Sequence, residues 1–296
     1  MTFTTLLSFF FIYGFLGWCT EVAFAAFKER KFVNRGFLNG PICPIYGVGI
    51  CVVVSLLTPI KDNLILLYIT STILVTLLEG VTGWAMDKIF HNKWWDYSEQ
   101  PLNIGGYVCL VFSLVWGVAC VAVVDLIHPP IAMVVKHIPS VVLVVILVIL
   151  SAALLADLWV TASTIFKMNK RLEAMELIAK ELHELSDQIG EGIFNQMTAT
   201  MERQEASKEK YEEAKEKYEE AKERILEVGI EFKEKSQDVS EEVTARIASL
   251  KQNYQELTEK GNAISRRLVR AFPKMKSRKS NEQLEKLRER LAGLKK

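Results

Sequence analysis

The chain has 296 residues, of which 50% are hydrophobic and 24% are charged, and its formal net charge is +1. The charges fall mainly in the second half and in short loops of the first half. This distribution indicates an apolar part up to about residue 166 and a Glu/Lys-rich part after it, rather than one soluble domain. The five cysteines lie in or beside apolar runs without a Cys-x-x-Cys pair, so we expect no zinc site, no disulfide framework and no cofactor.

Five apolar segments approach the ~20 residues that a helix needs to cross a bilayer. They lie at about 5–27, 41–59, 63–86, 106–127 and 140–164. The second segment is the weakest, because Pro41, Pro44, Gly47 and Gly49 interrupt its start. The alternative for that segment is a broken or re-entrant helix, whose freed backbone groups need protein or water partners.

Basic residues are concentrated in alternate loops. The loop after the first segment, the loop after the third and the chain leaving the fifth contain Lys28, Arg30, Lys31, Arg35, Lys88, Lys93, Lys167, Lys170 and Arg171, whereas the other loops hold Lys61 and Lys136. The positive-inside rule then predicts an outside N-terminus, five crossings and a cytoplasmic C-terminal region. The expected fold class is an all-α polytopic membrane bundle with five transmembrane helices and a long C-terminal helical or coiled-coil region.

Three carboxylates, Glu21, Glu79 and Asp157, lie inside these apolar segments. Each lies roughly 10–15 Å from the basic end of its segment at 1.5 Å per residue. Because a charge in hydrocarbon costs several kcal/mol, the common depth predicts one polar site that the three acids share. The alternative is that each acid reaches headgroup water by itself. Trp18 stands three residues before Glu21 and either lines this site or packs against a neighbouring helix.

Two predicted cytoplasmic loops have unusual sequences, NRGFLNGPICPIYG from Asn34 to Gly47 and WWDYSEQPLNIGG from Trp94 to Gly106. Gly, Pro and Asn suit turns, and an aromatic belt at the membrane boundary would explain the aromatic residues. We expect Arg35 to be the counter-ion of an intramembrane acid. The residues expected to gate the site or dock a partner are Asn34, Gly36, Asn39, Pro41, Pro44, Tyr46, Trp95, Asp96, Tyr97, Ser98 and Asn103.

Several of these motifs occur in a known family. The sequence resembles the ABC-transporter type IV family of bacterial membrane proteins, also called the CmpB family, over about residues 6–165. The resemblance rests on GWCTE at 17–21, NRGFLNGPICPIYG at 34–47, LLEGVTGW at 77–84, WWDYS at 94–98 and PLNIGGYVCLVFSLVWG at 101–117. It implies a multi-span protein of the bacterial inner membrane that is assigned to transport, and it does not extend to the charged C-terminal region.

The C-terminal region has a helical pattern from residue 167 that Gly190 and Gly192 interrupt, which predicts a helical connector with a hinge over 167–192. A coiled coil is predicted over 193–272. Its first seam contains Tyr211, Tyr218, Ile225 and Phe232 at heptad spacing, and its second contains Val243, Ile247, Leu250, Tyr254, Leu257, Ile264 and Leu268. The alternatives are an isolated charged helix stabilised by Glu–Lys pairs, and for the coiled coil either a homodimer or an intrachain hairpin.

Basic residues follow the second seam, where Pro273 ends the helical pattern and begins a basic tail over 273–296 with a short terminal helix. The cluster comprises Arg266, Arg267, Arg270, Lys274, Lys276, Arg278 and Lys279. Such a cluster near a bilayer attracts anionic lipid at about 1 kcal/mol per basic residue. Nucleic acid is the rival partner, and the predicted membrane tether favours lipid.

The favoured function is a permease-like transport component whose intramembrane acids line a cavity open to the cytoplasm. The sequence has no G-x-x-x-x-G-K-[ST] phosphate loop, so a separate ATP-binding subunit would hydrolyse ATP. The alternative is a membrane-anchored coiled-coil scaffold or signalling protein without transport activity. A membrane-embedded enzyme is less favoured, because the histidines lack metal-ligand spacing and no nucleophile motif occurs.

Overall fold

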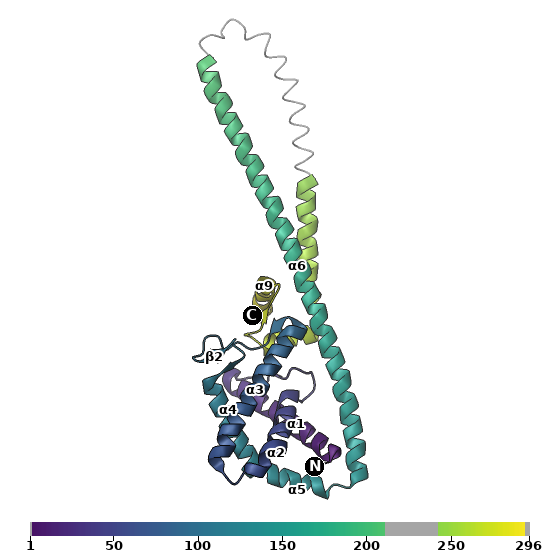
Figure 1. Cartoon of the computed structure of the whole chain (residues 1–296). Coiled ribbons are helices and arrows are strands. Elements are labelled where there is room, and N and C mark those ends of the chain that lie inside the picture. The colour runs from purple at the N-terminus through teal and green to yellow at the C-terminus, as the bar shows by residue number, and fades with distance from the viewer. Residues whose placement is uncertain (1, 211–241, 294–296) are drawn as a thin grey trace. The chain divides into compact units, whose positions relative to one another are not determined.

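The computed structural model describes residues 2–210 and 242–293, and its regular structure is almost entirely helical (Figure 1). The chain divides into two compact units. The first unit combines Met1–Lys170 with Gly261–Lys296, and the second consists of Arg171–Lys260. The expected all-α class is therefore confirmed, and the last part of the chain belongs to the same unit as the apolar helices.

Three helices of the first unit begin at residues that favour a helix start. The Thr2 hydroxyl and the Asn63 side chain accept backbone N–H groups at the starts of α1 and α3, and Pro44 occupies the first turn of α2. In chain order the helices are α1 (Phe3–Glu29), α2 (Pro44–Leu57), the short η1 (Thr58–Ile60), α3 (Leu64–Phe90), α4 (Leu110–Ala122), the π-helical η2 (Val123–Ile127), α5 (His128–His137) and α6 (Ser140–Lys210).

Four helical stretches are long and apolar enough to cross a membrane: Phe3–Lys28, Leu64–Phe90, Leu110–His137 and Ser140–Gln188. Large apolar side chains such as Ile73, Leu77, Val81 and Leu155 project from them without protein cover. An exposed apolar surface of this extent suits contact with lipid. The number of spans that the structure supports is thus four, and the segment expected at 41–59 is a shorter helix, Pro44–Ile60.

The stretch before α2 is not helical, although it lies deep beside α1. The Cys43 N–H donates to the Gly14 carbonyl at 2.9 Å, and Gly14 lies near the middle of α1. The prolines at 41 and 44 explain this, because a proline disfavours helical geometry in the residue before it and lacks an N–H. Residues 34–43 therefore form a bent, non-helical segment, and the chain becomes helical only at Pro44.

Two buried clusters hold α2 against its neighbours. One joins Val53 and Leu57 of α2 to Leu67 of α3 and to Cys120 and Val124 after them. The other contains apolar residues of α1, α2 and α5, and beside it the Tyr13 hydroxyl is 3.0 Å from His128 Nδ1. In Figure 1, α5 runs across the end of the bundle formed by the other apolar helices.

The end of the chain folds onto the first unit as three short elements, α8 (Ala263–Ala271), β4 (Lys276–Ser277) and α9 (Asn281–Gly293). Strand β4 pairs antiparallel with β1 (Asn92–Lys93), which directly follows α3. Strands β2 (Asn103–Ile104) and β3 (Val108–Cys109) form a second antiparallel pair. The short terminal helix expected in the basic tail corresponds to α9.

In the second unit, α6 continues to Lys210, and residues 242–259 form another helical segment. Arg246 Nη2 lies 2.7 Å from Glu181 Oε1, so these two segments of the same chain are in contact. The first predicted seam, Tyr211 to Phe232, lies outside the described residues. Helix α6 includes Gly190 and Gly192, and both the hinge and the coiled coil stay predictions.

The second seam divides between the two units. The helical segment ends at residue 259, and the Asn262 side chain accepts the Ser265 N–H at 2.8 Å to begin α8. Leu250 is buried in the second unit, whereas Leu268 is buried in α8 of the first. The apolar pattern that continues across Gly261 therefore belongs to two separate helices and not to one continuous helix.

The close packing of α1 against α2 gives a prediction with an internal control. A Cβ at Gly47 would lie 2.5 Å from the Phe10 carbonyl oxygen, whereas a Cβ at Gly49 has open space around it. We expect Gly47→Ala to lower the free energy of unfolding by about 1–3 kcal/mol through overpacking. Gly49→Ala, the same change in the same helix, should be neutral or slightly stabilising. Thermal unfolding in detergent, followed by intrinsic fluorescence, measures both, and equal unfolding temperatures would contradict the α1–α2 contact.

Candidate functional site

Glu21 of α1 lies among polar partners from the segment that follows it. Its Oε1 atom accepts a hydrogen bond from the Tyr46 hydroxyl at 2.7 Å, and its Oε2 atom lies 3.8 Å from Nε of Arg35. Tyr46 comes from the first turn of α2, and its ring packs edge-on against Trp116. The structure thus places the expected counter-ion Arg35 beside one of the intramembrane acids.

Glu79 of α3 meets the loop between α3 and α4. Its Oε1 atom accepts the Tyr97 hydroxyl at 3.2 Å, while its Oε2 atom is buried and has no hydrogen-bond partner among the described residues. The Tyr97 ring stacks on Phe112 at 5.0 Å. Burial raises the pKa of Tyr97, and the nearby Glu79, Cys109 and Glu21 raise it further. The Tyr97 hydroxyl therefore stays protonated and acts as a hydrogen-bond donor.

Asp157 of α6 has a different set of partners. One oxygen accepts the Asn39 backbone N–H at 3.2 Å, the Asn39 side-chain amide at 2.8 Å and the Thr161 hydroxyl at 3.2 Å, and the other accepts the Gly40 N–H at 2.7 Å. This carboxylate therefore satisfies the donors of Asn39 and Gly40 in the non-helical segment 34–43. Glu21 and Glu79 each accept a hydrogen bond from a tyrosine, whereas Asp157 binds the non-helical segment 34–43. The expectation of one site for all three acids stays a prediction.

The carbonyl groups of the same segment are satisfied from the far end of the chain. The Arg267 guanidinium of α8 donates to the carbonyls of Asn34, Gly36 and Phe37 at 3.3, 2.8 and 3.0 Å. Trp18 Nε1 donates to the Asn34 side chain at 2.8 Å, so Trp18 anchors this segment from α1. Asp157 and Arg267 together satisfy five backbone groups of this non-helical segment.

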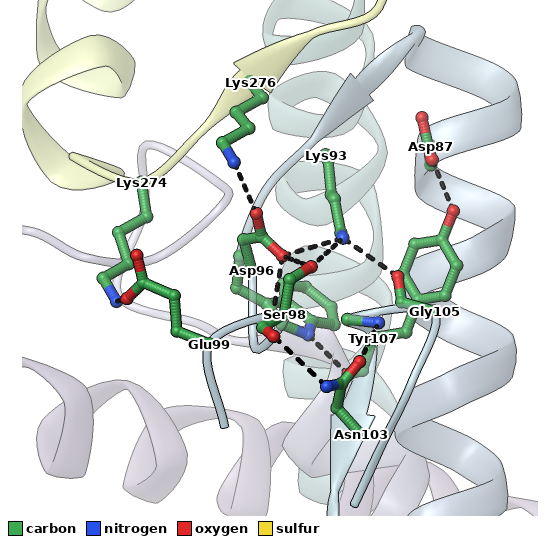
Figure 2. Close-up of polar contacts among 12 residues, drawn as sticks. Asp87, Lys93, Asp96, Ser98, Glu99, Asn103, Gly105, Tyr107, Lys274 and Lys276 are labelled. Carbon is green, nitrogen blue, oxygen red and sulfur yellow. Dashed lines mark hydrogen bonds and ion pairs between the residues drawn. The ribbon is translucent and has the colours of Figure 1, made fainter. Parts of the chain in front are cut away.

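The loop between α3 and α4 is braced by its own polar side chains (Figure 2). The Lys93 ammonium donates to Asp96 Oδ1 at 2.8 Å and to the Gly105 carbonyl at 2.9 Å. Ser98 donates through its backbone N–H to Asp96, and the Asn103 side chain bridges to the Gln100 carbonyl and the Gly106 N–H. We call residues 92–109 the braced loop.

Gly106 shows why a glycine is needed in the braced loop. Its φ is +71°, and a Cβ there would lie 2.3–2.6 Å from Lys93, Ser98 and Asp96. Only a residue without a side chain allows this backbone to approach the polar side chains so closely.

Basic residues of the C-terminal segment reach the braced loop and the end of α3. In Figure 2, Lys276 extends from β4 to Asp96, where Nζ and Oδ2 are 2.7 Å apart. The Arg278 guanidinium forms a bidentate pair with Asp87, whose carboxylate also accepts the Tyr107 hydroxyl at 2.5 Å. Lys274 lies 3.7 Å from Glu99. We call residues 272–278 the docked segment.

Electrostatics favour the ionised forms at this contact. Burial acts to raise the pKa of Asp96, but hydrogen bonds from Lys276, Lys93 and Ser98 outweigh it and hold that pKa well below its usual range. Asp96 in turn raises the pKa of Lys276. The pair is therefore fully charged at neutral pH.

Several residues of the predicted basic cluster have protein partners. Arg267 donates to backbone carbonyls, and Lys274, Lys276 and Arg278 pair with carboxylates, whereas Arg266 and Arg270 are exposed on α8. Binding of anionic lipid by this cluster stays a prediction.

Asp87 and Tyr107 were not among the expected site residues. Asp87 lies at the end of an apolar segment beside Lys88, and Tyr107 follows 20 residues later. In the sequence this pattern looks the same as residues that simply lie at a membrane boundary. Among the described residues, no group of three or more His, Cys, Asp or Glu side chains is arranged to hold a metal ion.

Comparison with known proteins identifies the apolar part of the chain. The family model described as "Putative ABC-transporter type IV" matches residues 8–162, which is more than half of the 296 residues. No curated protein and no solved structure matches the chain. The matched range includes Glu21, Glu79 and Asp157 and ends before the docked segment.

The role of Asp157 generates a prediction. Asp157→Asn keeps the shape but removes the charge and turns one acceptor into a donor facing the Gly40 N–H. We expect the free energy of unfolding to fall by about 2–3 kcal/mol, as for loss of hydrogen bonds to a charged group. Amide exchange over residues 34–43 should become faster, as measured by mass spectrometry. Asp125→Asn in η2 removes the same charge elsewhere and is the control; equal exchange in both variants would contradict the assignment.

Proposed function

Because the chain belongs to the ABC-transporter type IV family, we propose that it is a permease-like component of a transport system in a bacterial inner membrane. The transported group would interact with a polar site formed by Glu21, Arg35, Tyr46, Glu79 and Tyr97. This site would open to the cytoplasm through the braced loop.

The observation that carries the proposal is the incomplete pairing of Glu79. Ionisable residues within membrane spans usually face a protein interior and mark pathways for ions or substrates. Both oxygens of Asp157 accept hydrogen bonds, whereas Glu79 has one buried oxygen without a hydrogen-bond partner among the described residues. An oxygen in that state suits a proton or a hydrogen-bond donor carried by a substrate.

A transport system of this kind needs an energy source from another protein. The sequence contains no phosphate-binding loop of the G-x-x-x-x-G-K-[ST] type. We therefore propose a separate ATP-binding subunit as a partner. The two loops that border the polar site would be the surface that such a subunit engages.

The proposed topology has five crossings, an outside N-terminus and a cytoplasmic C-terminal region. The 17 residues of Pro44–Ile60 support a crossing, since 17 helical residues span about 25 Å, close to the thickness of the hydrocarbon core. Aromatic contacts join Phe37, Phe90 and Phe166, which supports a common side for the basic loops.

Cysteine labelling tests this topology. Arg30→Cys and His91→Cys should react with a membrane-impermeant reagent only from the cytoplasmic side, because both follow spans that end in basic residues. Asp62→Cys and Lys136→Cys, both at exposed positions, should react only from outside. Inside labelling of position 62 would show that Pro44–Ile60 does not cross.

A second candidate function is a membrane-anchored scaffold or signalling protein without transport activity. It is favoured by α6, whose 71 residues would extend about 105 Å, more than three times the thickness of a hydrocarbon core. The Arg246–Glu181 contact supports a helical assembly beyond the membrane. In this case the polar site would serve only helix packing.

Variants of the polar site distinguish the two functions. Membrane vesicles from wild-type and null cells are compared by mass spectrometry for solutes whose ATP-dependent uptake or release differs, and the solute found is then followed in the variants. We expect Glu21→Gln and Tyr46→Phe to lower its transport at least about tenfold, as when a charge-assisted hydrogen bond is lost. Asp62→Asn, an exposed loop acid, is the control. Wild-type transport by both variants would favour the scaffold.

A further inference from the structure

Two neighbouring residues of the braced loop face different partners. The Asp96 side chain binds Lys276 of the docked segment, while the next residue, Tyr97, donates to Glu79 inside α3. We propose that the docked segment is an intrachain latch that holds the braced loop closed over Glu79, and that its release admits water and solutes to that carboxylate. The inference rests on the proposed function of the polar site and assigns its regulation.

The latch contacts the loop in three physically different ways. Backbone pairing joins Lys276–Ser277 to Asn92–Lys93, and the Arg278 N–H donates to the His91 carbonyl at 3.0 Å. Ion pairs join Lys276 to Asp96 and Arg278 to Asp87. At the near end of the segment, Phe272 packs edge-on against the buried Trp94 at 5.0 Å. The docked segment is therefore held by backbone pairing and ring packing as well as by ion pairs.

The braced loop transmits the contact because it is internally rigid. The Tyr97 N–H donates to the Gly106 carbonyl at 2.9 Å, and Trp95 Nε1 donates to the Tyr107 carbonyl at 2.8 Å. Lys93 ties Asp96 to Gly105 across the loop. Movement of Asp96 therefore displaces Tyr97, whose hydroxyl is the hydrogen-bond donor to Glu79.

The latch is also weak enough to open. The Lys276 and Arg278 side chains are 58% and 59% exposed, although their partners Asp96 and Asp87 are 10% and 5% exposed. A pair of two-residue strands has little stability of its own. Ion pairs that are open to water are screened by salt. Release would break the strand pairing and the two ion pairs, and it would also separate Phe272 from Trp94.

The experiment uses the full chain in nanodiscs of neutral lipid. Lys276→Ala with Arg278→Ala removes two charges that contact the loop, and Arg266→Ala with Arg270→Ala removes two exposed charges from the same region as a matched control. A water-soluble carbodiimide with a small amine then converts reachable carboxyl groups to amides, and mass spectrometry gives the rate at Glu79. Amide exchange over residues 94–107 is measured in parallel.

In the double variant Lys276→Ala/Arg278→Ala we expect labelling of Glu79 to be about tenfold faster, with faster exchange over the loop, while the control matches the wild type. Lys276→Ala alone leaves the Arg278–Asp87 pair intact and should give an intermediate rate, which guards against misfolding of the double variant. Labelling of the wild type should rise at about 1 M salt, where the Debye length is about 3 Å. Unchanged labelling in both variants, or the same increase in the control, would overturn the latch.

These outcomes are separable from the fate of the transport proposal. Faster labelling in a protein whose Glu21→Gln variant transports normally would retain the latch and reject the transport site. Slow labelling in the latch variants, together with loss of transport in Glu21→Gln, would retain the site and reject the latch.

Discussion

The structure depends on satisfying the non-helical backbone of residues 34–43, which lies beside the middle of α1. Within a membrane such a segment is tolerated only where protein or water supplies hydrogen-bond partners. From α6, Asp157 accepts two of its N–H groups, and from α8, Arg267 donates to three of its carbonyls. The two partners are 110 residues apart in sequence, so the C-terminal elements are part of the apolar unit rather than an appendage.

The same consideration separates the roles of acids that look alike in the sequence. Asp157 accepts four hydrogen bonds from the non-helical segment 34–43 and Thr161, as expected of a carboxylate with a structural role. Glu79 accepts one from Tyr97 and has a buried oxygen without a hydrogen-bond partner among the described residues. The number of donors around each carboxylate, rather than its depth, distinguishes a structural acid from one available to a substrate.

Hydropathy and loop charge were enough to predict the apolar helices, because length and composition are local properties of a span. They placed the start of the second apolar segment too early, since the helix begins at Pro44 only after a stretch that is held by partners more than 100 residues away. The sequence composition revealed the basic cluster, but it did not reveal which of its residues bind protein groups and which face outward. Arg266 and Arg267 are adjacent on α8, and helical geometry turns one outward and the other toward carbonyl groups that no local pattern reveals. Contacts between distant segments, such as Arg278 with Asp87, account for most of what sequence analysis missed.

The order of the units along the chain affects the binding equilibrium of the docked segment. The second unit, Arg171–Lys260, is inserted between the last apolar helix and the elements that bind the braced loop, so the docked segment is a ligand attached to its own receptor. Its occupancy is set by an effective concentration that depends on the connecting chain, and not by the abundance of the protein. A free peptide of the same sequence would have to exceed that local concentration to compete. A single cut within the connecting chain would turn a permanent neighbour into one that can diffuse away.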